Sequence, residues 1–146
     1  MAVRCSDVVS QVEKLRGNGV AFVDSPGQGY YDVVWTGKAK GRMGREEFER
    51  LREAGVLIDV EREGTEEEGV LLQIFTKPIG EEPTVFLEFI ERRGCGDVGR
   101  ERGEGGDVEE GEGQELVVGC GGFGKGNFKA LFQGIELEER RRGLVK

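Results

Sequence analysis

The sequence predicts an α+β fold. Residues 8–15 and 45–54 place their apolar side chains at helical spacing, so that one face of each segment is apolar. Residues 70–76 and 84–90 are apolar runs, each interrupted by one polar residue, and a short connection with glycine and proline joins them. Two runs joined in this way are typical of an antiparallel pair of strands. Together these patterns predict helices packed against a sheet.

The first 23 residues predict a strand, a helix and a second strand. Residues 2–5 are short and largely apolar, and the Ser-Asp pair at 6–7 can cap the helix at 8–15. The Gly-Asn-Gly sequence at 17–19 ends that helix. Residues 20–23 then have the pattern of a short buried strand.

The next part of the chain predicts a loop, a helix and a strand. Residues 24–43 contain turn-forming glycine and proline, and three aromatic side chains can anchor this loop. Gly55 follows the helix at 45–54 and closes it, and 56–60 is an apolar strand. An acidic turn at 61–69 leads to the antiparallel pair.

The last third predicts a surface insertion, a glycine-rich loop and a helix. Residues 97–115 combine glycine with acidic residues and almost nothing apolar, which indicates a flexible insertion. The glycines at 119–126 do not form a phosphate-binding loop, because Lys125 is followed by glycine rather than serine or threonine. The expected final helix, 127–142, has an apolar face made of Phe128, Leu131, Phe132 and Ile135.

Composition excludes several classes of function. The net charge is −8, from 21 basic and 29 acidic residues, so a partner with a phosphate backbone is not expected. The 146 residues contain no histidine, which excludes a self-contained Ser-His-Asp or Cys-His triad and any metal site that needs imidazole. No apolar stretch reaches the roughly 18 residues of a membrane span. We therefore expect neither a nucleic-acid partner nor a membrane.

The three cysteines predict an intracellular protein. Cys5, Cys95 and Cys120 are widely and irregularly spaced, without a C-x-x-C pair. An odd number of cysteines and no pattern of a signal peptide predict reduced thiols in a cytoplasmic protein.

Two polar residues interrupt the predicted strand pair and are the candidates for chemistry. Glu88 lies among apolar neighbours, and an ionised carboxylate on a buried face needs a cation or another partner. Gln73 interrupts the other strand, and a buried amide must find hydrogen-bond partners. Because the strands are neighbours, both side chains can face one cavity. The alternatives are a solvent-exposed Glu88 on an edge strand and a purely structural hydrogen bond for Gln73.

Two long segments resemble a known family. Residues 71–95, LLQIFTKPIGEEPTVFLEFIERRGC, and residues 119–136, GCGGFGKGNFKALFQGIE, closely resemble the C-terminal part of the 4-hydroxyphenylpyruvate dioxygenases. The Pro26-to-Tyr31 segment and the helix that ends at Gly55 are similar too. The resemblance covers nearly the whole chain, and the insertion at 97–115 departs from it.

The resemblance implies a fold and an activity. The family belongs to the vicinal-oxygen-chelate superfamily, whose βαβββ modules form a curled mixed sheet with flanking helices, here followed by a C-terminal lid helix. Its enzymes use non-haem Fe(II), held by two histidines and one glutamate, to convert 4-hydroxyphenylpyruvate and O₂ into homogentisate and CO₂ in tyrosine catabolism. A small 2-oxo acid and O₂ are then the expected partners.

The resemblance also implies roles for particular residues. Glu88 corresponds to the metal-binding carboxylate, and Gln73 to an amide that helps hold the substrate, so these two are the expected catalytic residues. The expected substrate-binding residues are Gln73, Phe75, Phe86, Phe123, Asn127 and Phe128.

Both family histidines are missing, so the resemblance implies an incomplete enzyme. One would fall just upstream of Met1 and the other further upstream. We predict that residues 1–95 form a C-terminal module that is incomplete at its N-terminal end, 96–118 a flexible insertion, and 119–146 the pocket loop and helix. This chain alone is expected to be inactive and not to bind Fe(II) tightly, and its open apolar face favours a homodimer.

Three explanations for the truncation remain open: a fragment or incomplete gene model, a non-catalytic binding or scaffold protein with the same fold, and a metal site completed by another chain. A 4-hydroxymandelate synthase is the alternative within the enzymatic interpretation, because it resembles the dioxygenase in this region and uses the same substrate and metal.

Overall fold

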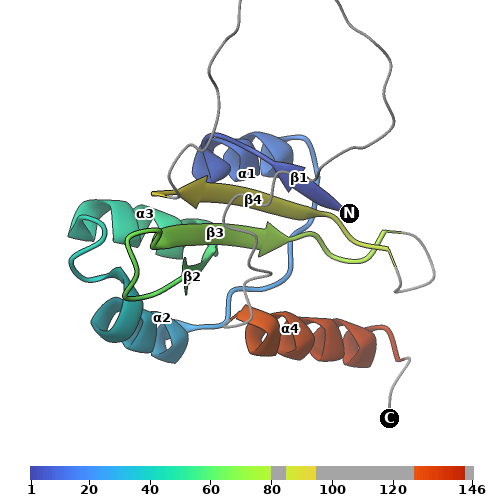
Figure 1. Cartoon of the computed structure of the whole chain (residues 1–146). Helices are drawn as coiled ribbons and strands as arrows, with labels where there is room; N and C mark the ends of the chain where they lie inside the picture. Colours follow the sequence, from blue (N-terminus) through green and yellow to red (C-terminus); the bar gives the residue numbers. More distant parts are fainter. Residues whose placement is uncertain (80–84, 95–126, 144–146) are drawn as a thin grey trace, which may run out of the picture.

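The computed structural model describes residues 1–79, 85–94 and 127–143, apart from the side chains of 128 and 138 (Figure 1). In chain order the elements are β1 (Ala2–Arg4), α1 (Val8–Gly17), α2 (Gln28–Val34), the π-helical turn η1 (Trp35–Ala39), α3 (Arg45–Ala54), β2 (Leu57–Glu61), β3 (Gly69–Phe75), β4 (Glu88–Arg93) and α4 (Phe128–Arg141). One strand, a helical region and three further strands follow each other, so the expected βαβββ order is confirmed.

The four strands form one mixed sheet in the order β1-β4-β3-β2. β1 runs parallel to β4, whereas β3 is antiparallel to both β4 and β2. The predicted antiparallel pair of β3 and β4 and the α+β class are therefore confirmed. The sheet is open, and the curl that the resemblance implied is not seen among these described strands.

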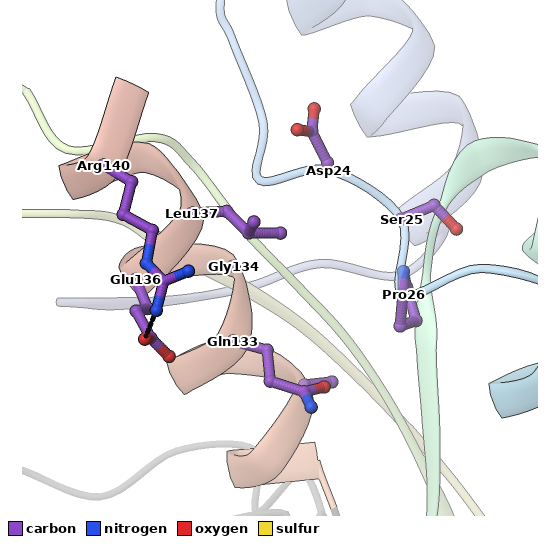
Figure 2. Close-up of a pocket in the computed structure, with 9 residues that line it drawn as sticks. Asp24, Ser25, Pro26, Gln133, Gly134, Glu136, Leu137 and Arg140 are labelled. Carbon is purple, nitrogen blue, oxygen red and sulfur yellow. Dashed lines mark hydrogen bonds and ion pairs between the residues drawn. The ribbon is translucent and has the colours of Figure 1, made fainter. Parts of the chain in front are cut away.

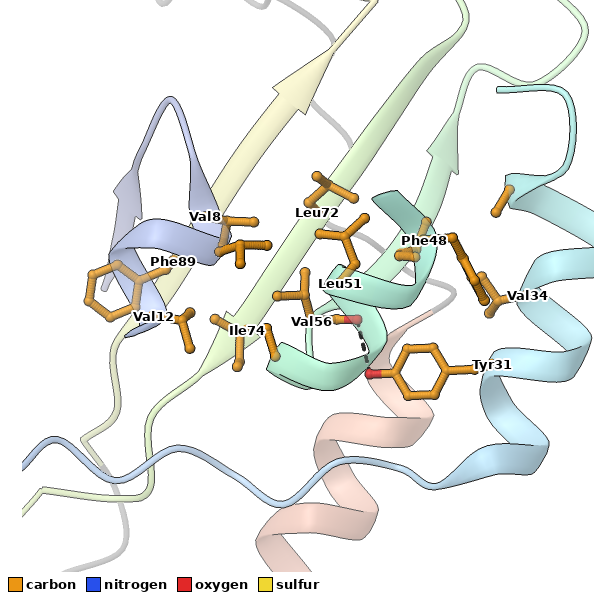
Figure 3. Packing of buried hydrophobic residues seen from close by; sticks show 14 of the residues in the cluster. Val8, Val12, Tyr31, Val34, Phe48, Leu51, Val56, Leu72, Ile74 and Phe89 are labelled. Carbon is orange, nitrogen blue, oxygen red and sulfur yellow. Dashed lines mark hydrogen bonds between the residues drawn. The ribbon is translucent and has the colours of Figure 1, made fainter. Parts of the chain in front are cut away.

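The core lies on the face of the sheet that α1 and α3 cover. Because side chains alternate along a strand, Leu72 and Ile74 of β3 point to this face, and both are buried. Figure 3 shows the packing around them, in which the labelled residues are Val8, Val12, Tyr31, Val34, Phe48, Leu51, Val56, Leu72, Ile74 and Phe89. The opposite face carries a smaller cluster of Leu57, Phe75 and Leu131, the last from α4. Figure 1 shows the sheet between α1 and α4.

Helices α1 and α3 confirm the helices expected from apolar spacing. The Asp7 side chain caps α1 by accepting a hydrogen bond from the backbone N–H of Ser10 at 3.0 Å. Gly55 ends α3 with a φ of 77°, a conformation that glycine adopts without steric strain. Phe48 and Leu51 of α3 point into the core, as the sequence predicts.

The expected loop at 24–43 is wrong, because it contains α2 and η1. Gly27, with a φ of 91°, turns the chain into α2, and Tyr31 and Val34 lie one turn apart on its buried face. The Tyr31 hydroxyl donates a hydrogen bond to the Val56 carbonyl at 3.1 Å, and its ring packs edge-on against Phe48. This short helix is stabilised by tertiary packing, so its own sequence carried little signal.

The expected strands at 20–23 and 84–90 are also partly wrong, and Thr76 is the reason. The segment at 20–23 forms only an isolated bridge, from Phe22 to Thr76. On the other side, the Thr76 hydroxyl accepts the Leu87 backbone N–H at 2.9 Å in place of a carbonyl. The regular ladder of β4 therefore starts at Glu88 and extends to Arg93, beyond the predicted end at 90.

Helix α4 confirms the predicted C-terminal helix, with one difference on its surface. Leu131 is buried against the sheet, but Phe132, which we expected on the apolar face, is 64% exposed. At Gly134 the helix approaches Val23 so closely that an added Cβ would lie 2.1 Å from Val23 Cγ1.

The insertion at 96–118 and the glycine-rich loop lie outside the described residues. Within the described part of the chain, none of the helices combines the length and the apolar character needed to cross a lipid bilayer.

Candidate functional site

Gln73 and Glu88 lie on the same face of the sheet. Gln73 is paired with Ile90 across the β3–β4 ladder, and Phe75 is paired with Glu88, so the two polar residues are diagonal neighbours. Gln73 Nε2 donates a hydrogen bond to Glu88 Oε1 at 2.7 Å. Gln73 is fully buried and Glu88 is half-buried. The structure thus brings together the two residues that the sequence predicted, with Glu88 as the first residue of β4 rather than in mid-strand.

Asn127 joins these residues from the start of α4. It is fully buried, and its Nδ2 donates to Gln73 Oε1 at 2.6 Å. Its Oδ1 accepts a hydrogen bond from the Tyr30 hydroxyl at 2.8 Å. Tyr30, Asn127, Gln73 and Glu88 therefore form one continuous chain of hydrogen bonds, which we call the polar relay.

Sequence reasoning treated Tyr30 only as an aromatic anchor and missed its place in the relay. Its hydroxyl also accepts the Ile58 backbone N–H at 3.0 Å. Burial raises the pKa of Tyr30 above its ordinary value of 10.0, so the hydroxyl remains protonated near neutral pH. The partner, Asn127, is 97 positions away, and local sequence patterns carry no signal for such a contact.

The aromatic residues expected at the site are only partly described. Phe75 is buried on the same face as Gln73, and its ring lies edge-on to Phe86 at a centroid distance of 5.9 Å. Phe86 is half-buried and precedes β4. The expectation that Phe86 lies within the strand is therefore wrong. Phe123 lies outside the described residues, and only the backbone of Phe128 is described. Their substrate-binding roles remain predictions.

Two further carboxylates on this face have cationic partners. Asp59 and Glu61 of β2 are buried. Asp59 pairs with Lys38 of η1, and Glu61 Oε2 lies 3.3 Å from Arg92 Nε. Such pairs stabilise buried charge, and they distinguish both groups from Glu88, whose hydrogen-bond donor is the neutral amide of Gln73.

The described residues do not form a self-contained iron site. Among them, no group of three or more His, Cys, Asp or Glu side chains is arranged to hold a metal ion. The whole chain lacks histidine. Glu88 can therefore offer one carboxylate to a metal, and imidazole ligands would have to come from outside these 146 residues.

A cavity of about 270 Å³ lies away from the polar relay (Figure 2). It opens between α4 and the segment Asp24–Pro26, and Gln133, Leu137 and Arg140 line its helical side. Arg140 is paired with Glu136 at 2.6 Å within the same helix. Neither Gln73 nor Glu88 lines this cavity, so it is not the site that the sequence predicted.

Comparison with curated proteins identifies relatives over nearly the full chain. A 4-hydroxyphenylpyruvate dioxygenase from Hordeum vulgare is 41% identical over 144 residues, covering 96% of this chain and 30% of that protein. Enzymes of the same name from Caenorhabditis elegans and Arabidopsis thaliana are 34% and 35% identical. This chain is related to 4-hydroxyphenylpyruvate dioxygenase. It spans about 30% of the length of these dioxygenases, consistent with the C-terminal part that the sequence indicated.

Solved structures with a similar fold include a 4-hydroxymandelate synthase and a fusion protein that contains 4-hydroxyphenylpyruvate dioxygenase. A mutant of 4-hydroxymandelate synthase from Streptomyces coelicolor matches 94% of this chain and 29% of its own, with a TM-score of 0.60 and 31% identity. A fusion of a xylose isomerase-like TIM barrel with 4-hydroxyphenylpyruvate dioxygenase has a TM-score of 0.61 at 21% identity, which supports the fold alone. No protein-family model matches the chain.

Proposed function

We propose that this chain is part of an Fe(II)-dependent dioxygenase that converts 4-hydroxyphenylpyruvate and O₂ into homogentisate and CO₂. The observation that carries the proposal is the buried relay that directs an amide N–H onto Glu88, in a chain up to 41% identical to enzymes of that name. Because the chain spans about 30% of those relatives, the histidine ligands are assigned to polypeptide outside these 146 residues.

In this proposal each relay residue has a role. Glu88 supplies the carboxylate of a site with two imidazoles, and Gln73 holds the Glu88 carboxylate in one orientation while helping to bind the 2-oxo acid. Asn127 orients Gln73. Phe75 and Phe86 provide an apolar wall on the same side of the sheet, as the aromatic ring of the substrate would require.

The domain boundaries follow the same proposal. Residues 1–95 form most of one vicinal-oxygen-chelate module, and 96–118 are an insertion between β4 and the closing segment. Residues 119–146 contribute Asn127 and α4, which cover the site face. The contact of buried Leu131 with the Leu57 and Phe75 cluster supports this last role.

The test begins with the natural protein that contains this chain. Its mass is measured by detecting peptides from residues 70–92, and the purified protein is assayed with Fe(II) for O₂ consumption and homogentisate release. The variant Glu88→Gln removes the charge but keeps the shape, and we expect activity to fall at least about 100-fold, since a metal ligand is lost. Glu66→Gln, at an exposed position in the β2–β3 turn, is the matched control. A natural protein of 16.1 kDa, or full activity of the Glu88 variant, would contradict the proposal.

Two other functions are distinguished by the same experiment. The match to 4-hydroxymandelate synthase favours a second candidate reaction, in which the same substrate gives 4-hydroxymandelate. Chromatography of the products separates the two reactions. A natural protein of 16.1 kDa without turnover would instead favour the non-catalytic binding or scaffold function.

A further inference from the structure

We propose that Tyr30 is a positioning residue for Glu88, acting through Asn127 and Gln73. This inference rests on the proposed function, because the relevance of the Glu88 orientation depends on it. Tyr30 is joined to Gln73 through the Asn127 amide, and Gln73 in turn is joined to Glu88.

The direction of the relay follows from the hydrogen-bonding capacity of each group. The Tyr30 hydroxyl has a single proton and already accepts the Ile58 N–H at 3.0 Å. The hydroxyl oxygen lies 2.8 Å from Asn127 Oδ1 and 3.2 Å from the Ile58 carbonyl oxygen, so the amide is the better acceptor of its proton. An Asn127 that accepts through Oδ1 must present its Nδ2 to Gln73.

The far end of the relay imposes the same direction. Gln73 Oε1 accepts from Asn127, which leaves Gln73 Nε2 to donate to the Glu88 carboxylate at 2.7 Å. If both amides were reversed, the Gln73 oxygen would face a carboxylate oxygen without a proton between them. At one end of the relay the Tyr30 hydroxyl donates a proton, and at the other end the Glu88 carboxylate accepts one. These two groups together hold the amides of Asn127 and Gln73 in one orientation.

The geometry of α2 makes Tyr30 a rigid anchor. Its hydroxyl is tied to the backbone of β2 at Ile58, and its ring packs edge-on against Tyr31 at 4.9 Å. Tyr31 in turn donates to the Val56 carbonyl at 3.1 Å. Each of the two adjacent tyrosines has its hydroxyl bonded to the backbone, Tyr30 at Ile58 and Tyr31 at Val56. Because Tyr30 is the one that is bonded to Asn127 of the relay, the two form a pair of test and control.

The experiment compares Tyr30→Phe with Tyr31→Phe in the natural protein that contains this chain. Each variant loses one buried hydroxyl and keeps the ring, and thermal melts verify that both fold. We expect Tyr30→Phe to lower kcat/KM for 4-hydroxyphenylpyruvate by about 10-fold or more, as for outer hydrogen-bond partners of metal ligands, and Tyr31→Phe to change it by less than about 2-fold. In NMR spectra, the side-chain amide protons of Gln73 should exchange faster only in Tyr30→Phe.

A double variant identifies the route of the effect. If Tyr30 acts through Asn127, the variant Tyr30→Phe/Asn127→Ala should be no less active than Asn127→Ala alone. The positioning role would be overturned if the losses of activity of Tyr30→Phe and Asn127→Ala multiplied in the double variant. It would also be overturned if Tyr30→Phe and Tyr31→Phe had equal activity, and in both cases the proposed function would stand. Absence of 4-hydroxyphenylpyruvate turnover by the wild-type protein would refute the proposed function itself.

Discussion

The close approach of α4 to the segment after α1 predicts the effect of Gly134→Ala. An ideal Cβ at this position would lie 2.1 Å from Val23 Cγ1, about 1.3 Å short of the 3.4 Å at which ordinary contact begins. Val23 is β-branched and has little rotational freedom about χ1, so the helix rather than the side chain must move. Overpacking of this kind costs about 1–3 kcal/mol, so over most of this range it outweighs the roughly 1 kcal/mol that alanine gains over glycine in a helix.

The assay measures the local opening of α4 by amide hydrogen exchange, with urea unfolding as the global reference. Gly134→Ala should lower the free energy of opening of α4 by up to about 2 kcal/mol, the difference between these two effects. Gly29→Ala is the matched control, because Gly29 lies in α2 with nothing within 4 Å of its added Cβ, and it should stabilise the protein by up to about 1 kcal/mol.

A second substitution tests the physical cause. Val23→Ala removes the clashing Cγ1 and leaves the Val23 Cβ at 3.5 Å from the added methyl group, which is ordinary contact. The double variant should therefore recover the stability that Gly134→Ala loses. The reasoning would be refuted if Gly134→Ala stabilised α4 as much as Gly29→Ala stabilises α2, or if Val23→Ala gave no recovery.

Three further predictions follow from the described contacts. The buried Glu91 accepts the Val8 backbone N–H at 2.7 Å, so Glu91→Ala should lower the free energy of unfolding by about 2–3 kcal/mol in urea titrations; a change below about 0.5 kcal/mol would contradict this. Hydrogen bonds from Arg42 and the Gly64 N–H lower the pKa of Glu68 from 4.5 to about 2, so its contribution to stability is complete above pH 4.5 and is lost as the pH falls toward 2. Arg42→Gln should return the pKa of Glu68 toward 4.5 in carboxyl NMR titrations, and an unchanged pKa would refute the assignment. Calorimetric titration of this chain with Co(II) should detect no tight binding, and a submicromolar dissociation constant that Glu88→Gln leaves unchanged would place a metal elsewhere.

Local patterns were sufficient for the elements whose signals lie within one segment. Helices α1 and α3 followed from apolar spacing and their caps, and β3 followed from a continuous apolar run, because its two faces are both covered. The neighbouring positions of Gln73 and Glu88 were also predictable, since one short connection joins their strands. Residues 28–39 gave no such signal, because α2 and η1 depend on burial of Tyr31 and Val34 against distant parts of the chain.

Tertiary structure alone decided how the site is completed. The start of β4 depends on the Thr76 hydroxyl, which accepts the Leu87 backbone N–H in place of a backbone carbonyl. No strand pattern in the sequence encodes that replacement. The hydrogen bond between Tyr30 and Asn127 joins residues 97 positions apart in the chain. The sequence by itself therefore indicated which residues are the candidates for the chemistry, through residue type and alternation. Only the folded chain decided which neighbours orient them, because hydrogen-bond partners are chosen by distance in space rather than along the chain.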